Sequence, residues 1–259
     1  MAIPNEYHFI CGMTPTDRPF SFIHYIAVKS CIEINHPSRA TVYYTYEPSG
    51  CWWERVRRLV TLVRVPEMKE ICGRPLLRPE HRSDVLRLQI LHECGGVYLD
   101  TDVLCIKPFS ELLTHEVVLG EEYGLGICNA VILAEPRSPF IARWLLEYQS
   151  FDPTKWNEHS VLLPKRLADG DESVTVLDHT HFFWPMYRDN CVDLRAFFFS
   201  EGTSFCRASY CVHLWEGLTG SFTRQLTPGL LWKLDSEFFL LARRFLGQRE
   251  TKALPYCSV

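Results

Sequence analysis

Two aspartates stand one residue apart after a short apolar run, in the stretch 96–102 (GVYLDTD). Alternate residues of a strand point to the same face, so the carboxylates of Asp100 and Asp102 can converge on one hard divalent cation. Such a cation, Mn²⁺ or Mg²⁺, would neutralise the charge that develops on a leaving diphosphate. A solvated strand end can carry the same motif, and the second D-x-D, at 169–171, lies in an evident loop and is assigned no role.

The sequence before the aspartates predicts a helix followed by a strand. The helix spans Pro79–Cys94, with proline in its first turn and Gly95-Gly96 as its stop. The strand covers Val97–Asp100, and a second short strand follows at Val103–Ile106. The aspartate pair is therefore expected where the chain turns outward between two strands.

Two charged residues of this helix, Asp84 and Arg87, are three positions apart and share a face. They could reach a ligand at the strand end. The alternative is an ordinary surface ion pair, which contributes roughly 0.3 kcal/mol to the stability of the fold.

The rest of the chain alternates strand and helix patterns, which predicts one α/β domain with a central mixed sheet. Further strands are expected at 7–11, 40–46, 116–120, 129–134 and 174–177, and further helices at 20–34, 139–148, 161–168 and 229–246. The sequence contains no internal repeat, low-complexity tract or Gly/Ser linker.

Composition excludes several classes of protein. The 259 residues are 47% hydrophobic and 22% charged, as in a globular chain, and the net charge of −4 argues against nucleic-acid binding. No apolar run is long enough to span a membrane. The 11 cysteines form no C-x-x-C pair, so we expect no zinc site. No N-x-S/T sequon occurs, which favours a cytosolic-type compartment. Without a signal peptide, a complete chain is expected to be cytoplasmic; if an anchor was removed, the Golgi lumen is expected.

The stretch 81–109 resembles the signature of a known family of DXD-containing glycosyltransferases. This family contains α-1,4-galactosyltransferases and initiating α-1,6-mannosyltransferases, and the sugar-transferring domains of large clostridial toxins are more distantly similar. The matching residues are Ser83, Asp84, Arg87, Leu91, Gly95, Gly96, Tyr98, Asp100 and Asp102.

The resemblance implies a GT-A fold, in which one doubly wound domain covers 1–259. A nucleotide-sugar half, 1–109, would end in the D-x-D, and an acceptor-side half, 110–259, would follow. It also implies a metal-dependent, retaining hexosyl transfer from a nucleotide sugar to a glycan, protein or lipid hydroxyl. Mn²⁺ or Mg²⁺ would be the cation. UDP-hexose is favoured over GDP-mannose as the donor.

Family roles carry over to particular residues. Asp102 is expected to ligate the metal directly, and Asp100 to contact the metal, one of its waters or the ribose. His213, in the family's C-terminal histidine motif, would add a metal or diphosphate contact, although a lone histidine is often structural. Asp84 and Arg87 would touch donor-sugar hydroxyls, with Arg87 also near the diphosphate.

Four further residues are expected at the donor site. Asn129 resembles the family's asparagine strand and would present its amide to the donor sugar or the acceptor; a buried, backbone-satisfied asparagine is the alternative. Trp215 would wall the diphosphate or sugar, or else pack in the core. Phe9 and Ile10 would contact the base through backbone groups. The family often has tryptophan where this chain has Cys11, which weakens the case for stacking on the base.

Three other features allow two interpretations. Trp52-Trp53 could form an acceptor-sugar platform, but a helix start that buries both indoles is favoured. Glu121-Glu122 follows an apolar strand, where a retaining enzyme could hold a nucleophile or base, yet no spacing supports that role. The segment 238–250 (FFLLARRFLGQRE) is expected to be an amphipathic docking helix, with membrane-surface contact as the alternative.

Two rival functions were weighed against transfer. An aspartyl-phosphate phosphatase also uses D-x-D after an apolar strand, but it needs Thr or Val where this chain has Leu104. A catalytically inactive relative that binds sugars or partners is opposed by the intact signature.

Overall fold

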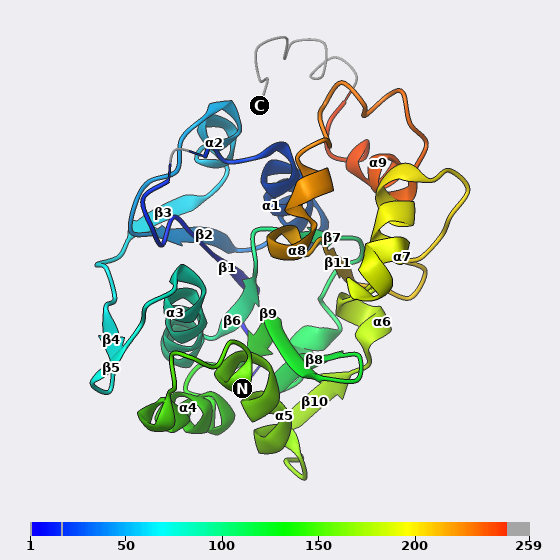
Figure 1. Ribbon diagram of the computed structural model, residues 1–259. Helices are drawn as coiled ribbons and strands as arrows, with labels where there is room; N and C mark the ends of the chain where they lie inside the picture. Colours follow the sequence, from blue (N-terminus) through cyan, green and yellow to red (C-terminus); the bar gives the residue numbers. More distant parts are fainter. Residues whose placement is uncertain (1, 17, 248–259) are drawn as a thin grey trace.

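The structure, a computed structural model, describes residues 2–16 and 18–247. Its centre is a seven-stranded mixed sheet, which confirms the expected α/β class (Figure 1). The strands follow the order β10 (Val174–Leu177), β8 (Val117–Glu122), β9 (Gly126–Ala134), β6 (Gly96–Leu99), β1 (Glu6–Cys11), β2 (Arg39–Tyr44) and β3 (Thr61–Arg64).

The strands β6, β1, β2 and β3 run parallel, whereas β9 is antiparallel to both β6 and β8. The carboxyl ends of the four parallel strands therefore meet at one edge of the sheet. Ligands of open α/β sheets bind outside this edge. The segment 100–102 follows β6 directly and lies there.

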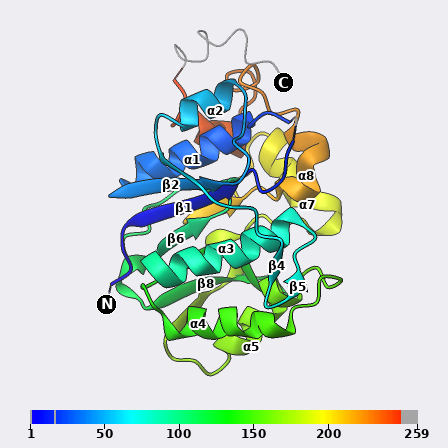
Figure 2. The same ribbon diagram turned by 90° about the vertical axis from the view of Figure 1, so that its left-hand side faces the viewer.

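Helices cover both faces of the sheet. On one face, α1 (Phe22–Asn35) and α2 (Cys51–Val56) pack in the same apolar cluster as Tyr7 and Phe9. On the other, α3 (Pro79–Cys94) and α4 (Pro139–Leu146) pack with Ile10. Alternate residues of β1 thus serve opposite cores, as a strand requires. Figure 2 shows α3 lying across the sheet, with α4 and α5 (Leu163–Ala168) beyond it.

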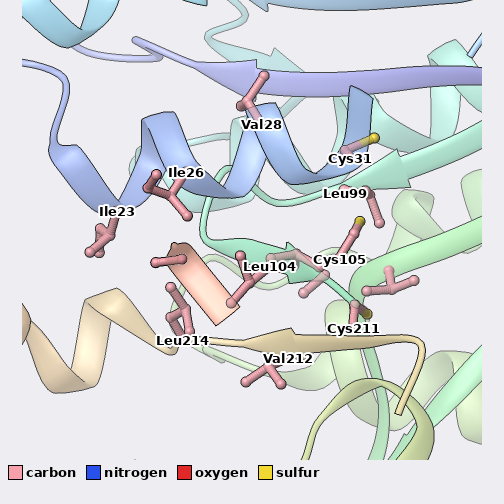
Figure 3. Packing of buried hydrophobic residues seen from close by; sticks show 14 of the residues in the cluster. Ile23, Ile26, Val28, Cys31, Leu99, Leu104, Cys105, Cys211, Val212 and Leu214 are labelled. Carbon is pink, nitrogen blue, oxygen red and sulfur yellow. The ribbon is translucent and has the colours of Figure 1, made fainter. Parts of the chain in front are cut away.

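A second, two-stranded sheet lies against α1. It pairs β7 (Val103–Cys105) with β11 (Cys211–His213) in antiparallel register. Figure 3 shows α1, β7 and β11 in successive layers, with Cys31, Cys105 and Cys211 in the apolar contact between them. This small sheet brings residues that are distant in sequence to the end of β6.

The remaining elements are short. They are the hairpin β4 (Glu70–Ile71) and β5 (Arg74–Pro75), the 3₁₀ turns η1 (Leu112–Thr114) and η2 (Glu147–Ser150), the π-helix η3 (Glu158–Leu162), and the helices α6 (His179–Phe182), α7 (Arg188–Phe199), α8 (Glu216–Thr223) and α9 (Glu237–Ala242). No helix in the described ranges is long and apolar enough to cross a membrane.

The helix predicted over 229–246 is wrong in extent. Only α9, Glu237–Ala242, is helical there, because Ser236 caps its start and also forms an isolated bridge with Glu201. The preceding residues form turns, whose carbonyls at Leu231 and Leu234 accept hydrogen bonds from the guanidinium of Arg243. The predicted docking helix 238–250 is therefore confined to this short, inward-packed element, and residues 248–250 lie outside the described part.

Burial decides between the two interpretations of Trp52-Trp53. Trp52 and Trp53 in α2 are 5% and 1% exposed, so they are core residues and not a sugar platform. Among the described residues nine cysteines carry free thiols, five of them buried, and Cys51 is disulfide-bonded.

Candidate active site

The two aspartates of the D-x-D lie in a turn between β6 and β7. The amide of Asp100 donates to the carbonyl of Ala130 at 2.9 Å, which extends the pairing of β6 with β9. The amide of Val103 then donates to the carbonyl of Asp100 at 3.1 Å and closes the turn. Backbone pairing on both sides therefore fixes the two carboxylates at the carboxyl end of β6.

Pairing of β7 with β11 brings His213 to Asp102. Val103 and His213 are register partners, and the amide of Leu214 donates to the carbonyl of Asp102 at 3.0 Å. The imidazole Nε2 of His213 lies 3.3 Å from Oδ1 of Asp102. One ligand atom each of Asp100, Asp102 and His213 lies within 4.8 Å of the others. The three residues predicted as metal ligands are thus brought together.

Asp102 and His213 stabilise each other's charge. Burial alone would raise the pKa of Asp102. The charge and hydrogen bond of His213 outweigh this effect, and the Glu216 amide, which donates to Oδ2 at 2.8 Å, adds to them, so the pKa of Asp102 is lowered. Burial would lower the pKa of His213, but Asp102 raises it well above its usual value. A cation bound at Nε2 would have to displace the proton from this ion pair.

Arg87 joins the two ends of the predicted donor site. Its guanidinium Nη1 lies 3.2 Å from Oδ1 of Asp100, and Nη2 lies 3.3 Å from Oδ1 of Asp84. Nη1 also donates to the carbonyl of Asn129 at 2.7 Å. Arg87 is only 4% exposed, so the pair that could have been a surface ion pair is buried. Burial raises the pKa of Asp84, which the charge of Arg87 opposes.

Asn129 lies in β9 opposite this helix face, and its Nδ2 donates to Oδ1 of Asp84 at 2.8 Å. The hydroxyl of Tyr98 donates to Oδ1 of Asp100 at 2.6 Å, and the ring of Tyr98 lies under the Arg87 guanidinium at 4.4 Å. Oδ1 of Asp100 is therefore held by two residues. The sequence predicted no role for Tyr98 in the site, although its spacing from Asp100 placed both on one strand face.

Trp215 adopts a left-handed backbone conformation, φ 55°, directly before α8. Its ring lies 4.1 Å from the ring of His213 and 4.8 Å from that of Tyr187. Among the described residues no group accepts from its buried indole Nε1. Trp215 therefore packs against His213 of the metal-type cluster and also belongs to the hydrophobic core, and its role toward a donor stays a prediction.

Other predicted residues lie at varying distances from this centre. Phe9 and Ile10 are buried side chains of β1, so only their backbone could reach a base, which stays a prediction. Glu122 is 4% exposed and accepts from the hydroxyl of Tyr187 at 2.7 Å. The amide of Glu216 was not anticipated, and its closeness to His213 in sequence was the available signal.

The sheet and the cluster define an α/β enzyme fold with an acidic centre at the carboxyl end of a central strand. The family described as "Glycosyltransferase sugar-binding region containing DXD motif" matches residues 27–119. Glucan organizing enzyme 1 of Cryptococcus neoformans is 32% identical over 96% of this chain and 72% of its own length. The chain belongs to this family of DXD-containing glycosyltransferases and has a GT-A fold.

Two further similarities are more limited. Mannosyl phosphorylinositol ceramide synthase of Saccharomyces cerevisiae is 35% identical over 29% of this chain and 19% of its own length. Among solved structures, the PaToxG glycosyltransferase superposes with a TM-score of 0.49 at 17% identity, over 65% of this chain and 69% of that one.

Proposed function

We propose that this protein is a metal-dependent, retaining glycosyltransferase that moves a hexose from a nucleotide diphosphate sugar to a hydroxyl acceptor. The observation that carries the proposal is the cluster of Asp100, Asp102 and His213 at the carboxyl end of β6. Two carboxylates and an imidazole suit Mn²⁺, which accepts oxygen and nitrogen ligands, and Mg²⁺ is the alternative.

The residues of the cluster fit such a cation. Oδ1 of Asp100 is occupied by Tyr98 and Arg87, which leaves Oδ2 as its metal-facing atom. Nε2 of His213 and Oδ1 of Asp102 already face each other. When bound, the cation would supply charge to the diphosphate as the sugar departs.

The chain's own groups would position the donor. The start of α8 follows His213 closely, and the partial positive charge of a helix N-terminus suits a diphosphate, although the Glu216 amide there already donates to Asp102. Asp84 would accept hydrogen bonds from the sugar hydroxyls, and the amide of Asn129 would donate to them, as the resemblance implies. Arg87, buried between Asp84 and Asp100, would hold both carboxylates in place.

For the stereochemistry we propose retention through attack of the acceptor on the face from which the diphosphate leaves. Asp84 is committed to Arg87 and Asn129, and Glu122 to Tyr187, so neither is a free nucleophile. An oxocarbenium-like state flanked by the departing diphosphate needs no covalent intermediate. The anomeric configuration of the product, read by NMR, would contradict this mechanism if inverted.

Two donors are proposed for comparison. UDP-hexose is the donor that the sequence favours, and GDP-mannose is supported by the mannosyl transfer named for the yeast relative. The base would lie beyond the carboxyl ends of the parallel strands. A cavity at the ends of β2 and β3 is lined by Thr45, Tyr46, Arg64 and Glu67.

The test is a thermal-shift panel of UDP, GDP and their sugars with Mn²⁺, Mg²⁺ or EDTA. A ligand that binds only the folded state raises the unfolding temperature. We expect one nucleotide to stabilise the protein only with metal. Asp102→Asn should lose this response and donor turnover, while Asp169→Asn, an exposed change in the second D-x-D, should keep both. Full activity of Asp102→Asn would refute the metal site, and no shift with any nucleotide would favour an inactive relative.

A further inference from the structure

Beside Asp84 lies a group of buried polar atoms that have no hydrogen-bond partner. Within the described residues these are both ring nitrogens of His81 and the hydroxyl of Tyr148. His81 is 2% and Tyr148 is 1% exposed. Buried polar groups are nearly always hydrogen-bonded, and a cluster of exceptions calls for a missing partner such as a ligand or an ordered water.

Both residues are close to the predicted donor site. His81 lies one helical turn before Asp84 in α3, so the two share a face. The pKa of Tyr148 is raised by burial and, next, by the charge of Asp84. His81 in turn opposes the rise in the pKa of Asp84. The unpartnered atoms therefore lie close enough to Asp84 for its charge to act on them.

An exposed tryptophan closes this group toward solvent. The ring of Trp156 lies 5.9 Å from that of His81, and the guanidinium of Arg78 lies 5.2 Å from the indole. Phe151, stacked on Tyr148 at 5.6 Å, forms the other wall and contacts His81 at 5.1 Å. Trp156 is 55% exposed, unlike the buried Trp52 and Trp53.

We propose that His81, Tyr148 and Trp156 form the subsite for a carbohydrate acceptor, which rests on the proposed transferase function. A sugar ring has an apolar C–H face that suits the indole and a hydroxyl edge that suits the unpartnered atoms. In this proposal Trp156 changes rotamer, so that the hydroxyl groups of the sugar can reach His81 and Tyr148.

The substitution Tyr148→Phe tests the subsite through stability and binding together. If the hydroxyl has no partner in the free protein, its removal raises the unfolding temperature. It also weakens binding of an acceptor that would hydrogen-bond to it. A purely structural role predicts the opposite change in stability. A lowered unfolding temperature with unchanged sugar binding would overturn the proposal.

The aromatic contact is tested with Trp156→Ala and the control Trp232→Ala. Trp232 is 40% exposed and also lies beside an arginine, with the guanidinium of Arg243 5.2 Å from its indole. The probes are methyl α-D-mannopyranoside and methyl β-D-glucopyranoside, followed by saturation-transfer NMR. We expect the signal from one glycoside to be lost in Trp156→Ala and retained in Trp232→Ala. Equal signals in both variants, or none in the unmodified protein, would overturn the subsite.

Transfer assays separate this proposal from the function on which it rests. Donor hydrolysis with Mn²⁺ measures transfer to water and needs no acceptor. We expect the KM of Trp156→Ala for the glycoside to rise about tenfold, while the control Trp232→Ala keeps the unmodified rates of donor hydrolysis and transfer. Absence of donor hydrolysis in the unmodified protein would reject the transferase but leave NMR binding as an independent test of the subsite.

Discussion

Oδ1 of Asp102 lies 3.3 Å from Nε2 of His213, although Asp102 lies in the turn before β7 and His213 ends β11, far along the chain. Both side chains are buried, so each supplies the charge that makes burial of the other tolerable. The same pair provides two of the three ligands in the proposed metal site. Stability and metal binding are thus linked through one contact.

Replacing His213 by Ala should destabilise the metal-free protein by about 3 kcal/mol, because Asp102 would remain buried without its partner. Urea unfolding in EDTA measures this change. The control is His181→Ala, whose ring pairs with the half-exposed Asp178 and should cost under about 1 kcal/mol. Addition of Mn²⁺ should stabilise the unmodified protein more than His213→Ala. Equal losses in the two variants would contradict a structural role for the Asp102–His213 pair.

Replacing Arg87 by Gln should leave Asp84 and Asp100 without the cation between them. We expect a loss of about 3 kcal/mol in unfolding free energy, and donor turnover reduced by roughly a hundredfold. Arg87→Lys should be intermediate, because an ammonium cannot match the planar fork that contacts several acceptors. Unfolding and donor hydrolysis are measured in parallel. An unchanged turnover in Arg87→Gln would show that Asp100 does not need this contact.

Replacing Gly96 by Ala should disturb the strand that carries the aspartates. A Cβ there would lie 2.6 Å from the carbonyl oxygen of Glu6 and 2.9 Å from Nε2 of His8, and φ is +103°. We expect a cost of about 3 kcal/mol from clash and backbone strain. Gly170→Ala is the control, since φ is +73° but nothing lies within 4 Å, and it should cost about 1 kcal/mol. Similar losses in both variants would assign the whole effect to backbone strain.

The stability of the protein should fall on mild acidification, and His8 is one source. Burial lowers its pKa, partly offset by its hydrogen bond to the carbonyl of Gly95. As the pH falls below about 6.5, His8 is protonated in the unfolded chain but not in the folded protein. Stability therefore declines from about pH 6.5 down to the lowered pKa of the folded state. Each unit of that lowering corresponds to about 1.4 kcal/mol.

Unfolding free energies measured between about pH 6.5 and pH 5 should show this decline. Above that range the raised pKa of His213 acts in the opposite direction, so its contribution to stability grows as the pH falls toward about 6.5. In His8→Gln the slope should be smaller. A part of it should persist, because burial also lowers the pKa of His159. A slope that is identical in the variant and the unmodified protein would exclude His8 as a source.

Local signals were sufficient for α3 and the aspartate turn. The helix begins and ends as predicted, at Pro79 and Cys94, because proline preorganises the first turn and Gly95 adopts φ 66° after the last. The alternation of β1 and the apolar β6 likewise predicted the central strands. These features depend on neighbours in sequence, which a single chain reveals.

Tertiary structure decided which distant residues meet. The pairing of β7 with β11, which brings His213 to Asp102, depends on non-local hydrogen bonds that no spacing encodes. The same applies to α9: its pattern continues over 229–246, yet Ser236 and the carbonyls bound by Arg243 confine the helix to six residues. Burial also separated Trp52 and Trp53 from Trp156, because exposure is set by what packs against a side chain and not by its type.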